Sequence, residues 1–282
     1  MSDYIKTDNS KYKLGVIGDP IDHSLSPKIH NIFAKQTEIK IDYQAYHVLP
    51  ENLDSFIRDF FINGGDGLNV TLPHKVKCLR SVWEPSSLVK IIGAANTLRY
   101  IRSSKKIIAY STDGRGLATD LKEKVKLKSA NVLILGAGGA ALSIIPSIEN
   151  CLPANIILDN RSQEKIQPLI ERFDDPSRIH TKIVHIDNFK GDVDLVINAT
   201  SAGFSGPFKW HRELNTNDRT VFYDLSYSNS EEKTPFLKWA SQYSNNCYDG
   251  FGMLINQAAL SFEHWTKSKP NTKITKADLF ND

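Results

Sequence analysis

The sequence predicts an α/β fold with mostly parallel sheets, divided into two domains. Short apolar strands alternate with helical segments along the chain, which is the order found in parallel β-α-β units. The chain has 282 residues, whereas a single domain commonly takes about 100–200. Hydrophobic residues make up 40% of the chain and charged residues 24%, which is typical of a folded globular protein.

The first half of the chain contains one series of alternating elements. In chain order we expect a strand at 12–18, a helix at 27–35, a strand at 43–47, a helix at 53–61 and a strand at 67–70. These elements form the first β-α-β series.

A second series begins near Asp113. We expect, in order, a helix at 117–124, a strand at 131–135, a helix at 140–148, a strand at 155–158, a helix at 164–173, strands at 194–198 and 221–224, and a helix at 235–243. Residues 251–265 carry apolar side chains at mixed helical spacing, which predicts a long helix that packs on another element.

Charge and composition favour a small-molecule partner. Lys and Arg number 35 against 32 Asp and Glu, a weaker basic balance than nucleic-acid-binding proteins usually show. The first residues lack the apolar core of a secretory signal, and no stretch approaches the roughly 18 apolar residues of a membrane span. We therefore expect a cytoplasmic protein that binds neither nucleic acid nor membrane.

Cysteine and histidine spacing gives no sign of a metal site. The 3 cysteines are far apart and form no Cys-x-x-Cys pair, and His180 and His185 are isolated from other ligand types. We expect no disulfide framework and no bound metal.

A glycine-rich turn lies between an apolar strand and a helix. Residues 136–141 read Gly-Ala-Gly-Gly-Ala-Ala, in the order required of a dinucleotide-binding β-α-β unit. Gly136 permits the tight turn, and Gly138 lets the backbone approach a pyrophosphate bound at the helix N-terminus. Ala140 or Ala141 replaces a third glycine at the helix–strand contact. The same turn is also compatible with S-adenosylmethionine or with packing alone.

The end of the next strand bears on the choice of dinucleotide. A carboxylate there normally accepts hydrogen bonds from the ribose of NAD, whereas an arginine accommodates the 2′-phosphate of NADP. Asp159 could serve NAD, or the alternation of the strand could turn it away. Arg161, with Lys165 one helical turn further, could clamp a phosphate dianion. We favour NADP.

Two hydroxyl groups precede the first helix. Ser24 and Ser26 are two residues apart, so in an extended segment both point the same way and suit a hydroxylated or carboxylated ligand. The alternative is that Ser26 and Pro27 are simply the N-cap and first residue of the helix.

Polar residues also follow the strand at 67–70. Asn69 and Thr71 lie where open parallel sheets bind ligands, at the carboxyl end of a strand. Alternatively, Thr71 caps a helix that begins at Pro73, and Lys75 is an ordinary surface lysine. Both interpretations remain open from these residues alone.

Two further turns supply an amide and a carboxylate. Asn96 lies in the first turn and Asp113 in the second, where it could also be an N-cap or turn residue. If Asp113 meets Lys75, the pair can transfer protons, because the carboxylate orients the ammonium group.

Taken together, these motifs resemble those of the shikimate dehydrogenase family, in family order from about residue 15 to 262. The matching segments are Gly18-x-Pro-Ile-x-His-Ser-Leu-Ser-Pro, Asn69-Val-Thr-Leu-Pro-His-Lys, Gly93-Ala-x-Asn-Thr, Thr112-Asp-Gly-x-Gly, Gly136-Ala-Gly-Gly-Ala, Asn160-Arg, Asn198-Ala-Thr-Ser-Ala-Gly and Asp249-Gly-x-Gly-Met-Leu-x-x-Gln257-Ala.

The resemblance implies reversible NADPH-dependent reduction of 3-dehydroshikimate to shikimate, a step of aromatic amino-acid biosynthesis. It also implies a Rossmann-type NADP-binding domain at residues 112–249. A discontinuous α/β substrate domain, made of residues 1–111 and 250–282, would enclose it in the sequence. A homodimer is one expected assembly.

The resemblance also implies roles for individual residues. Lys75 and Asp113 would be the catalytic pair, and Ser24 and Ser26 would hold the substrate carboxylate. The other implied substrate-binding residues are Asn69, Thr71, Asn96, Tyr227 and Gln257. The implied cofactor-binding residues are Gly136, Ala137, Gly138, Gly139, Ala140, Asn160, Arg161, Lys165, Ala199, Thr200, Ser201 and Gly250.

The sequence departs from the family pattern at two positions. Ser111 stands where the family usually has Asn, two residues before the catalytic Asp. Lys165 stands where the family usually has Arg, and Lys is a weaker bidentate partner for phosphate. Two alternatives therefore stay open: a relative that acts on quinate or prefers NAD, and a catalytically silent nucleotide-sensing relative.

Overall fold

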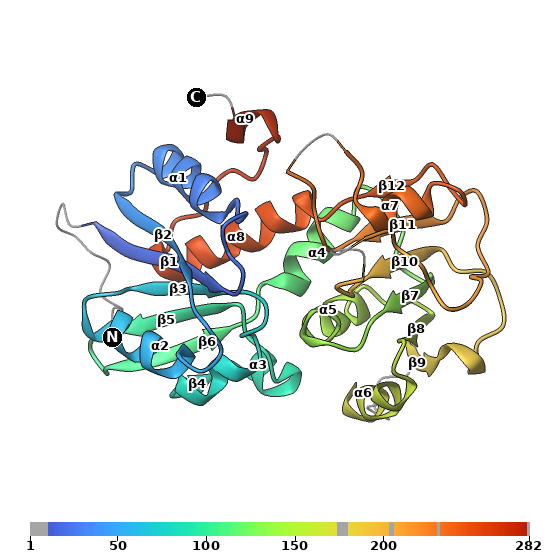
Figure 1. Ribbon diagram of the computed structural model, residues 1–282, viewed down its shortest axis with the longest axis horizontal. Coiled ribbons are helices and arrows are strands. Elements are labelled where there is room, and N and C mark those ends of the chain that lie inside the picture. The colour runs from blue at the N-terminus through green and yellow to red at the C-terminus, as the bar shows by residue number, and fades with distance from the viewer. Residues whose placement is uncertain (1–10, 174–179, 203–205, 230–231, 281–282) are drawn as a thin grey trace. The chain divides into compact units, whose positions relative to one another are not determined.

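The computed structural model describes residues 11–173, 180–202, 206–229 and 232–280, and the chain divides into two compact units. Unit 1 comprises Met1–Thr112 and Ile255–Asp282, and unit 2 comprises Asp113–Leu254 (Figure 1). The two ends of the chain therefore belong to the same unit.

Unit 1 contains a six-stranded mixed sheet in the order β2-β1-β3-β5-β6-β4. The strands are β1 (Tyr12–Gly18), β2 (Ile41–His47), β3 (Gly67–Val70), β4 (Glu84–Pro85), β5 (Thr97–Ile101) and β6 (Lys106–Tyr110). The helices are α1 (Ser26–Thr37), α2 (Leu53–Ile62), α3 (Ser87–Ile92), α9 (Ala277–Phe280) and the part of α8 (Phe251–Thr266) from Ile255 onward, with a 3₁₀-helix at Lys77–Ser81. Strand β1 is parallel to β2 and β3, and β4 is parallel to β6, whereas β5 is antiparallel to β3 and β6.

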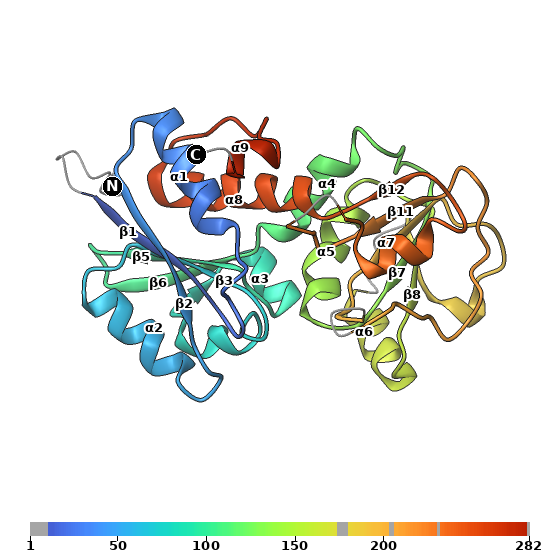
Figure 2. The same cartoon turned by 45° about the horizontal axis from the view of Figure 1, so that its top comes forward.

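Helices cover both faces of this sheet (Figure 2). On one face, Ile57 of α2 packs in an apolar cluster with Leu68 of β3. On the other face, Phe33 of α1 packs edge-to-face on Phe262 of α8, with ring centroids 5.8 Å apart. Since Phe262 follows unit 2 in the sequence and Phe33 precedes it, this aromatic contact joins the two chain segments that form unit 1.

A tryptophan near the end of α8 fixes the helix on the sheet. The indole Nε1 of Trp265 donates a hydrogen bond to the carbonyl oxygen of Leu98, at 2.9 Å. A Cβ atom on Gly67 would collide with this indole, so glycine is required where β3 begins. Helix α8 therefore packs directly on the backbone of β3 and β5 through Trp265.

Unit 2 contains a six-stranded parallel sheet in the order β12-β11-β10-β7-β8-β9. The strands are β7 (Asn131–Leu135), β8 (Asn155–Asp159), β9 (Lys182–His185), β10 (Leu195–Asn198), β11 (Val221–Asp224) and β12 (Cys247–Tyr248). The helices are α4 (Asp113–Leu121), α5 (Gly139–Glu149), α6 (Ile166–Phe173) and α7 (Pro235–Ala240), with 3₁₀-helices at Gln163–Lys165 and Ile186–Asn188. Numbered within this unit and read from β9, the strand order is 3-2-1-4-5-6, the order of a dinucleotide-binding sheet.

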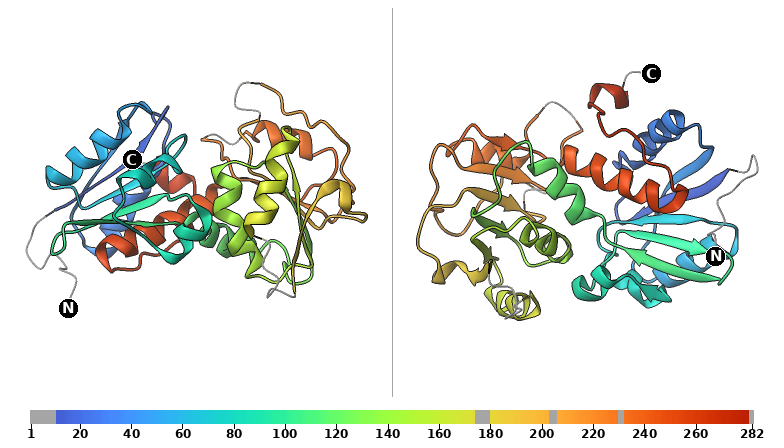
Figure 3. Two further views of the ribbon diagram at one scale, coloured as in Figure 1. Left: turned by 90° about the horizontal axis from the view of Figure 1, so that it is seen from below. Right: turned by 180° about the vertical axis from the view of Figure 1, so that it is seen from behind.

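The side chains of this second sheet pack into two apolar layers. Ile156 and Ile197 lie in the layer shared with α4, α5 and α6, where α5 contributes Ile144. Phe222 lies in the other layer, with Phe236 of α7. Figure 3, left, shows α5 in light green beside α6 in yellow. No described helix has both the length and the apolar character needed to cross a bilayer.

The predicted fold class is confirmed, and several element boundaries are corrected. Helix α4 begins at Asp113 rather than Leu117, so interpreting Asp113 as a turn or N-cap residue was wrong. Its first turn contains Gly114, where a Cβ would lie 2.6 Å from the carbonyl oxygen of Ser143 in α5. The first turn of α4 therefore contains a residue of low helix propensity, Gly114, because this position packs closely on α5.

Other departures concern caps and missed elements. Ser26 is the first residue of α1 and Leu25 its N-cap, so the N-cap interpretation of Ser26 was wrong. Thr71 caps no α-helix at Pro73, because a turn leads into the 3₁₀-helix Lys77–Ser81. Helix α7 ends at Ala240, and α4 ends at Leu121, each three residues before the predicted end. The strands and α-helices missed by the prediction are β4, β5, β6, β9, β12, α3 and α9.

Candidate active site

Asn96 is the centre of a buried hydrogen-bond network in unit 1. Its Nδ2 donates to Thr112 Oγ1 at 2.8 Å and to Gln257 Oε1 at 3.0 Å. Its Oδ1 accepts the backbone N–H of Thr112 at 2.8 Å and the hydroxyl of Thr97 at 3.1 Å. The side chain is 3% exposed, so these bonds replace its hydration and fix its orientation.

Asn69 extends this network toward α1. The Asn69 Nδ2 donates to the carbonyl oxygen of Asn96 at 3.1 Å, and its Oδ1 accepts the hydroxyl of Tyr43 at 2.7 Å. The phenol of Tyr43 is also hydrogen-bonded to the side chain of Ser26. Burial raises the pKa of Tyr43 well above its usual value, so the phenol stays protonated and can donate. Tyr43 therefore connects Ser26 to Asn69.

Helix α8 supplies two polar residues to the same network. Gln257 accepts from Asn96, and Ser261 lies one helical turn further along the same face. Asn69 donates to Ser261 Oγ at 3.1 Å, and the hydroxyls of Ser261 and Thr97 are 2.7 Å apart. Helix α8 thus adds Gln257 and Ser261 to the hydrogen-bond network of Asn69, Asn96 and Thr97.

The loops after β1 and β3 carry the remaining predicted residues of unit 1. Ser24 Oγ accepts the backbone N–H of Ser26 at 3.3 Å, which holds the two hydroxyls in one turn. A Cβ on Gly18 would lie 2.6 Å from Thr71 Cγ2, so Gly18 makes room for Thr71 beside β1. The carbonyl oxygen of Lys75 accepts the N–H of Ala95 at 2.8 Å, next to Asn96. The structure therefore brings the turns of Ser24, Thr71, Lys75 and Asn96 to the sheet edge where β1 and β3 end.

The predicted catalytic residues belong to different units. Lys75 lies in unit 1, and Asp113 is the first residue of unit 2. Asp113 directly follows Thr112, whose N–H and hydroxyl are both bound to Asn96. The pairing of Lys75 with Asp113 remains a prediction.

The glycine turn of unit 2 joins β7 to α5. Gly136 has a φ of 118°, in the region that favours glycine, and its N–H donates to the carbonyl oxygen of Asp159 at 2.7 Å. A Cβ at Gly136 would lie 2.9 Å from the carbonyl oxygen of Ala199. The turn therefore passes between the ends of β8 and β10 and has no space for a side chain at Gly136.

The N-terminus of α5 is open. Its N-cap is Gly138, which provides no side-chain hydrogen bond, and the first turn contains no acidic residue. A Cβ on Gly138 would have no neighbour within 4 Å. Free N–H groups and the positive end of the helix dipole make this terminus suitable for a pyrophosphate. Gly139 and Ala140, the first two residues of α5, are half-buried, as is Ala137 in the turn.

The turn after β8 places cationic side chains outward. Asn160 Nδ2 donates to the carbonyl oxygen of Ser162 at 2.9 Å, which shapes the turn. Arg161 and Lys165, a guanidinium and an ammonium side chain, are both exposed residues. The preceding carboxylate of Asp159 is fully buried and accepts a hydrogen bond from Trp210 Nε1 at 2.8 Å.

The ends of β10 and β11 are tied together by side chains. Asn198 Nδ2 donates to Asp224 Oδ1 at 3.0 Å, and its Oδ1 accepts the hydroxyl of Thr200 at 2.7 Å. Thr234 donates to the other carboxyl oxygen of Asp224 at 2.6 Å. Burial raises the pKa of Asp224 to about 6, because the charged form is desolvated. Ala199 is buried beside this cluster, and Ser201 is exposed after it.

Gly250 and Tyr227 also belong to unit 2. The N–H of Gly250 donates to the carbonyl oxygen of Ser226 at 2.9 Å. A Cβ on Gly250 would lie 2.7 Å from the carbonyl carbon of Leu225, so the start of α8 packs backbone to backbone on the loop after β11. Tyr227 is half-buried in that loop, in a different unit from the other predicted substrate-binding residues.

Sequence reasoning missed four residues that organise these sites. Ser261 could have been found from its spacing of four residues after Gln257 on a predicted helix. Tyr43 gave a weaker signal, as one aromatic residue in a strand. Trp210 and Arg212 gave none, because their segment lies about 50 residues from Asp159 in the sequence and carries no strand or helix pattern.

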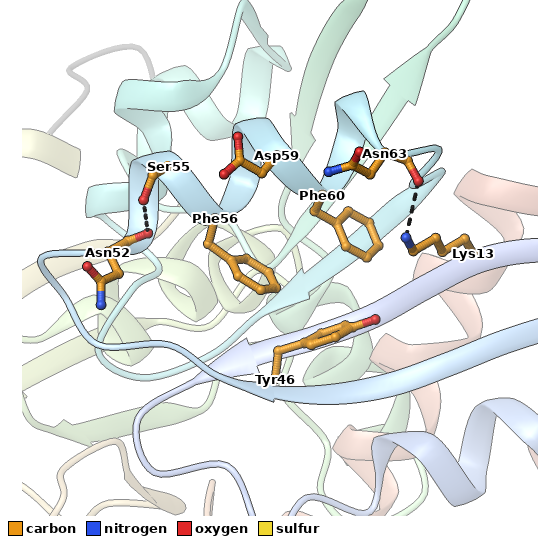
Figure 4. Close-up of a pocket in the computed structure, with 8 residues that line it drawn as sticks. All are labelled: Lys13, Tyr46, Asn52, Ser55, Phe56, Asp59, Phe60 and Asn63. Carbon is orange, nitrogen blue, oxygen red and sulfur yellow. Dashed lines mark hydrogen bonds between the residues drawn. The ribbon is translucent and has the colours of Figure 1, made fainter.

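A cavity of about 390 Å³ lies elsewhere in unit 1, between α2 and strands β1 and β2 (Figure 4). Its aromatic lining is Tyr46, Phe56 and Phe60, and Lys13 Nζ donates to the carbonyl oxygen of Asn63 at 3.1 Å. None of the predicted site residues lines it, and α2 covers the sheet face opposite to α8. Among the described residues, no group of three or more His, Cys, Asp or Glu side chains could hold a metal ion.

The fold and these two sets of residues define a class. Unit 2 has a parallel sheet in the 3-2-1-4-5-6 order with an open glycine turn, and unit 1 has a buried polar network. This is the organisation of a two-domain dinucleotide-dependent dehydrogenase.

Family models identify the particular family. The model of the shikimate dehydrogenase substrate binding domain matches residues 16–98, that of shikimate/quinate 5-dehydrogenase matches 117–226, and that of the shikimate 5′-dehydrogenase C-terminal domain matches 250–279. The chain belongs to the shikimate dehydrogenase family.

Individual relatives agree with this assignment. Shikimate dehydrogenase (NADP⁺) of Vesicomyosocius okutanii is 38% identical over 271 residues, covering 95% of this chain and 99% of the relative. The enzyme of that name from Legionella pneumophila is 39% identical over 261 residues, covering 93% and 96%. A crystal structure of a shikimate dehydrogenase in complex with NADP⁺ is 33% identical, covers 96% of this chain and 95% of its own, and has a TM-score of 0.81. The Thermus thermophilus enzyme in complex with NADP(H) and shikimate is 25% identical, covers 95% and 98%, and also has a TM-score of 0.81.

Proposed function

We propose that this protein catalyses the reversible NADPH-dependent reduction of 3-dehydroshikimate to shikimate, a step of aromatic amino-acid biosynthesis. The observation that carries the proposal is the buried network in which Asn69, Asn96 and Gln257 are joined, at the sheet edge that also bears Lys75. Relatives named shikimate dehydrogenase (NADP⁺) support it over nearly the whole chain. Unit 1 would bind the substrate and unit 2 the dinucleotide.

The substrate is small, polar and anionic, and unit 1 offers matching groups. Ser24 and Ser26 present two hydroxyls in one turn for the carboxylate of the substrate. Thr71, Asn96 and Gln257 supply groups for its ring hydroxyls, and Asn69 holds Asn96 in place. Because Asn96 and Gln257 are bonded to each other, they are already oriented before the substrate binds. Tyr227 is a further proposed substrate-binding residue.

The residues of unit 2 fit a phosphorylated dinucleotide. The open N-terminus of α5 would hold the pyrophosphate, and Gly136 keeps the turn clear of side chains. Exposed Arg161 and Lys165 would hold the 2′-phosphate, with Asn160 shaping their turn. Ala137, Gly139, Ala140, Ala199, Thr200, Ser201 and Gly250 would complete the dinucleotide site.

Acid–base chemistry would come from Lys75 and Asp113. When bound, NADPH supplies a hydride to the carbonyl carbon of the substrate. Lys75 would stabilise the negative charge that develops on the carbonyl oxygen and donate a proton to that oxygen. Asp113 would orient the Lys75 ammonium group and accept a hydrogen bond from the neighbouring substrate hydroxyl. In the reverse direction, Lys75 would accept the proton.

A spectrophotometric assay tests the reaction and its alternatives. Purified protein is mixed with shikimate and NADP⁺, and NADPH formation is followed at about 340 nm, where reduced nicotinamide absorbs. The reaction is repeated with quinate and with NAD⁺, and the four kcat/KM values are compared. A preference for quinate or NAD⁺ would contradict the proposed substrate or cofactor. The absence of any absorbance change would favour a catalytically silent relative.

Substituting Lys75 tests the catalytic assignment. If Lys75 is the acid–base group, Lys75→Ala should lower kcat by about 10²–10⁴-fold. Lys77→Ala is the matched control, because Lys77 is an exposed lysine two residues further along the chain and should leave kcat unchanged. Near-normal turnover of Lys75→Ala would refute the role of Lys75. A cytoplasmic location and a homodimeric assembly are further proposals, which cell fractionation and light scattering would test.

A further inference from the structure

Asp159 occupies the position at which NAD-binding sheets usually place a carboxylate for the ribose. It ends β8, pairs in register with Leu135 at the end of β7, and accepts the N–H of Gly136 through its carbonyl oxygen. A free carboxylate here would accept the 2′-hydroxyl of NAD. The same carboxylate would repel the 2′-phosphate of NADP, because like charges in a protein of low dielectric interact strongly.

The carboxylate of Asp159 is occupied by another segment of unit 2. Oδ2 accepts Trp210 Nε1 at 2.8 Å and lies 3.2 Å from Arg212 Nε. Oδ1 accepts Gln163 Nε2 at 3.1 Å and lies 3.5 Å from His211 Nε2. Each carboxyl oxygen therefore accepts one hydrogen bond, and Oδ2 is also ion-paired with Arg212, whose Nε donates to His211 Nε2 at 3.3 Å. The side chain has no exposed surface.

Arg212 is itself fixed by a second carboxylate. Its Nη1 is 2.6 Å from Asp187 Oδ1, in the 3₁₀-helix after β9. The hydrogen bond from Arg212 lowers the pKa of Asp187, which keeps this partner ionised. Arg212 thus bridges the ends of β8 and β9 and holds its guanidinium against Asp159.

The cationic residues that follow Asp159 are exposed to solvent. Gln163 spans Asp159 and the backbone of Asn160, while Arg161 and Lys165 are exposed. The short turn after β8 therefore has a buried carboxylate, Asp159, followed by two exposed cationic residues, Arg161 and Lys165. This arrangement depends on residues 210–212, which lie outside the glycine-turn motif.

We propose that Trp210 and Arg212 determine the cofactor specificity of this protein by binding and neutralising the Asp159 carboxylate. They remove the acceptor that NAD would use and the negative charge that would repel NADP. The two residues act through Asp159 and are positioning residues. The inference rests on the proposed function, since it concerns the dinucleotide that the reaction uses.

Dissociation constants measured by isothermal titration calorimetry test this proposal without turnover. Arg212→Ala should weaken NADP⁺ binding by more than about tenfold, because a buried carboxylate is left without its cation beside the phosphate site. NAD⁺ binding should stay the same or tighten, so the ratio of the two constants falls. Arg219→Ala is the matched control, since Arg219 is an exposed arginine of the same unit and should leave both constants unchanged.

The double variant Arg212→Ala/Asp159→Asn separates the proposed mechanism from direct phosphate binding by Arg212. Removing the charge of Asp159 should restore the NADP⁺ dissociation constant to within about threefold of the wild-type value. If NADP⁺ binding stays weak in the double variant, Arg212 contacts the phosphate itself and the proposal is overturned. Unchanged NADP⁺ binding in the single variant would also overturn it.

A milder variant guards against loss of folding. Trp210→Phe removes one donor from Asp159 but keeps the aromatic ring, so it should weaken NADP⁺ binding by about threefold to tenfold. Circular dichroism and thermal unfolding verify that each variant is folded. Wild-type protein that binds NADP⁺ but fails to oxidise shikimate would count against the proposed reaction alone. Wild-type protein that prefers NAD⁺ would overturn the specificity inference.

Discussion

Tyr43 is the residue whose removal tests the polar network of unit 1 most directly. Its phenol donates to Asn69 Oδ1 at 2.7 Å, is hydrogen-bonded to Ser26, and is 4% exposed. In Tyr43→Phe the oxygen stays buried and loses its donor, while the ring still stacks on His30, whose ring centroid is 4.3 Å away.

The expected magnitude follows from these contacts. Leaving one buried acceptor unpaired costs about 1–3 kcal/mol of the free energy of unfolding. A loss of roughly 2 kcal/mol should lower Tm by about 4–8 °C in a protein of this size. Because Ser26 also loses its partner, KM for shikimate should rise by about threefold to tenfold, with a smaller change in kcat.

Differential scanning calorimetry and initial-rate kinetics measure the two effects. Tyr46→Phe is the control, because Tyr46 lies on the same strand, lines the cavity on the α2 face and makes no hydrogen bond through its hydroxyl to the described residues. The control should change the free energy of unfolding by less than about 0.5 kcal/mol. An unchanged Tm and an unchanged KM in Tyr43→Phe would show that the network neither stabilises unit 1 nor orients Ser26.

Three further predictions concern unit 2. Burial raises the pKa of Asp224 to about 6, so between pH 4 and pH 6 the unfolded state loses this proton first and stability falls as pH rises, by roughly 3 kcal/mol at most. Asp224→Asn should remove this component of the pH dependence, measured as the free energy of unfolding in chemical denaturation. The control is Asp218→Asn, because Asp218 is exposed. An Asp224→Asn variant less stable than wild type above pH 6 would contradict the prediction. Gly250→Ala should cost about 1–3 kcal/mol of stability, because its Cβ meets the backbone of Leu225. In Gly138→Ala the added Cβ has open space, so Tm should stay the same while NADP⁺ binding weakens in calorimetry. An unchanged Tm in Gly250→Ala together with a lowered Tm and unchanged NADP⁺ binding in Gly138→Ala would refute the roles of these glycines.

The elements predicted well are those whose signal is local. Strands β1, β3, β7 and β11 begin and end where their apolar runs predict. Local patterns failed where neighbours decide the structure. Strands β5 and β6 form an antiparallel hairpin that was missed, and Lys105 in its turn has a φ of 53°, which few lysines adopt.

The candidate site divides in the same way. Gly136 and Gly138 were predicted from their place between a strand and a helix, and the structure supplies the close contacts of the first and the open space around the second. For Asp159, the sequence left two orientations open. The structure decides between them, because donors from residues 210–212 lie on the buried side of the strand.

The sequence by itself determined the alternation of strands and helices, the glycine turn and the order of the family motifs, because each depends on residues close together in the chain. The tertiary structure alone decided which distant side chains share a hydrogen bond. Gln257 meets Asn96 across 161 residues of sequence, and Trp210 meets Asp159 across 51. No local pattern encodes such pairs, since they form when sheets and helices bury their apolar faces and the polar groups carried inside must find partners.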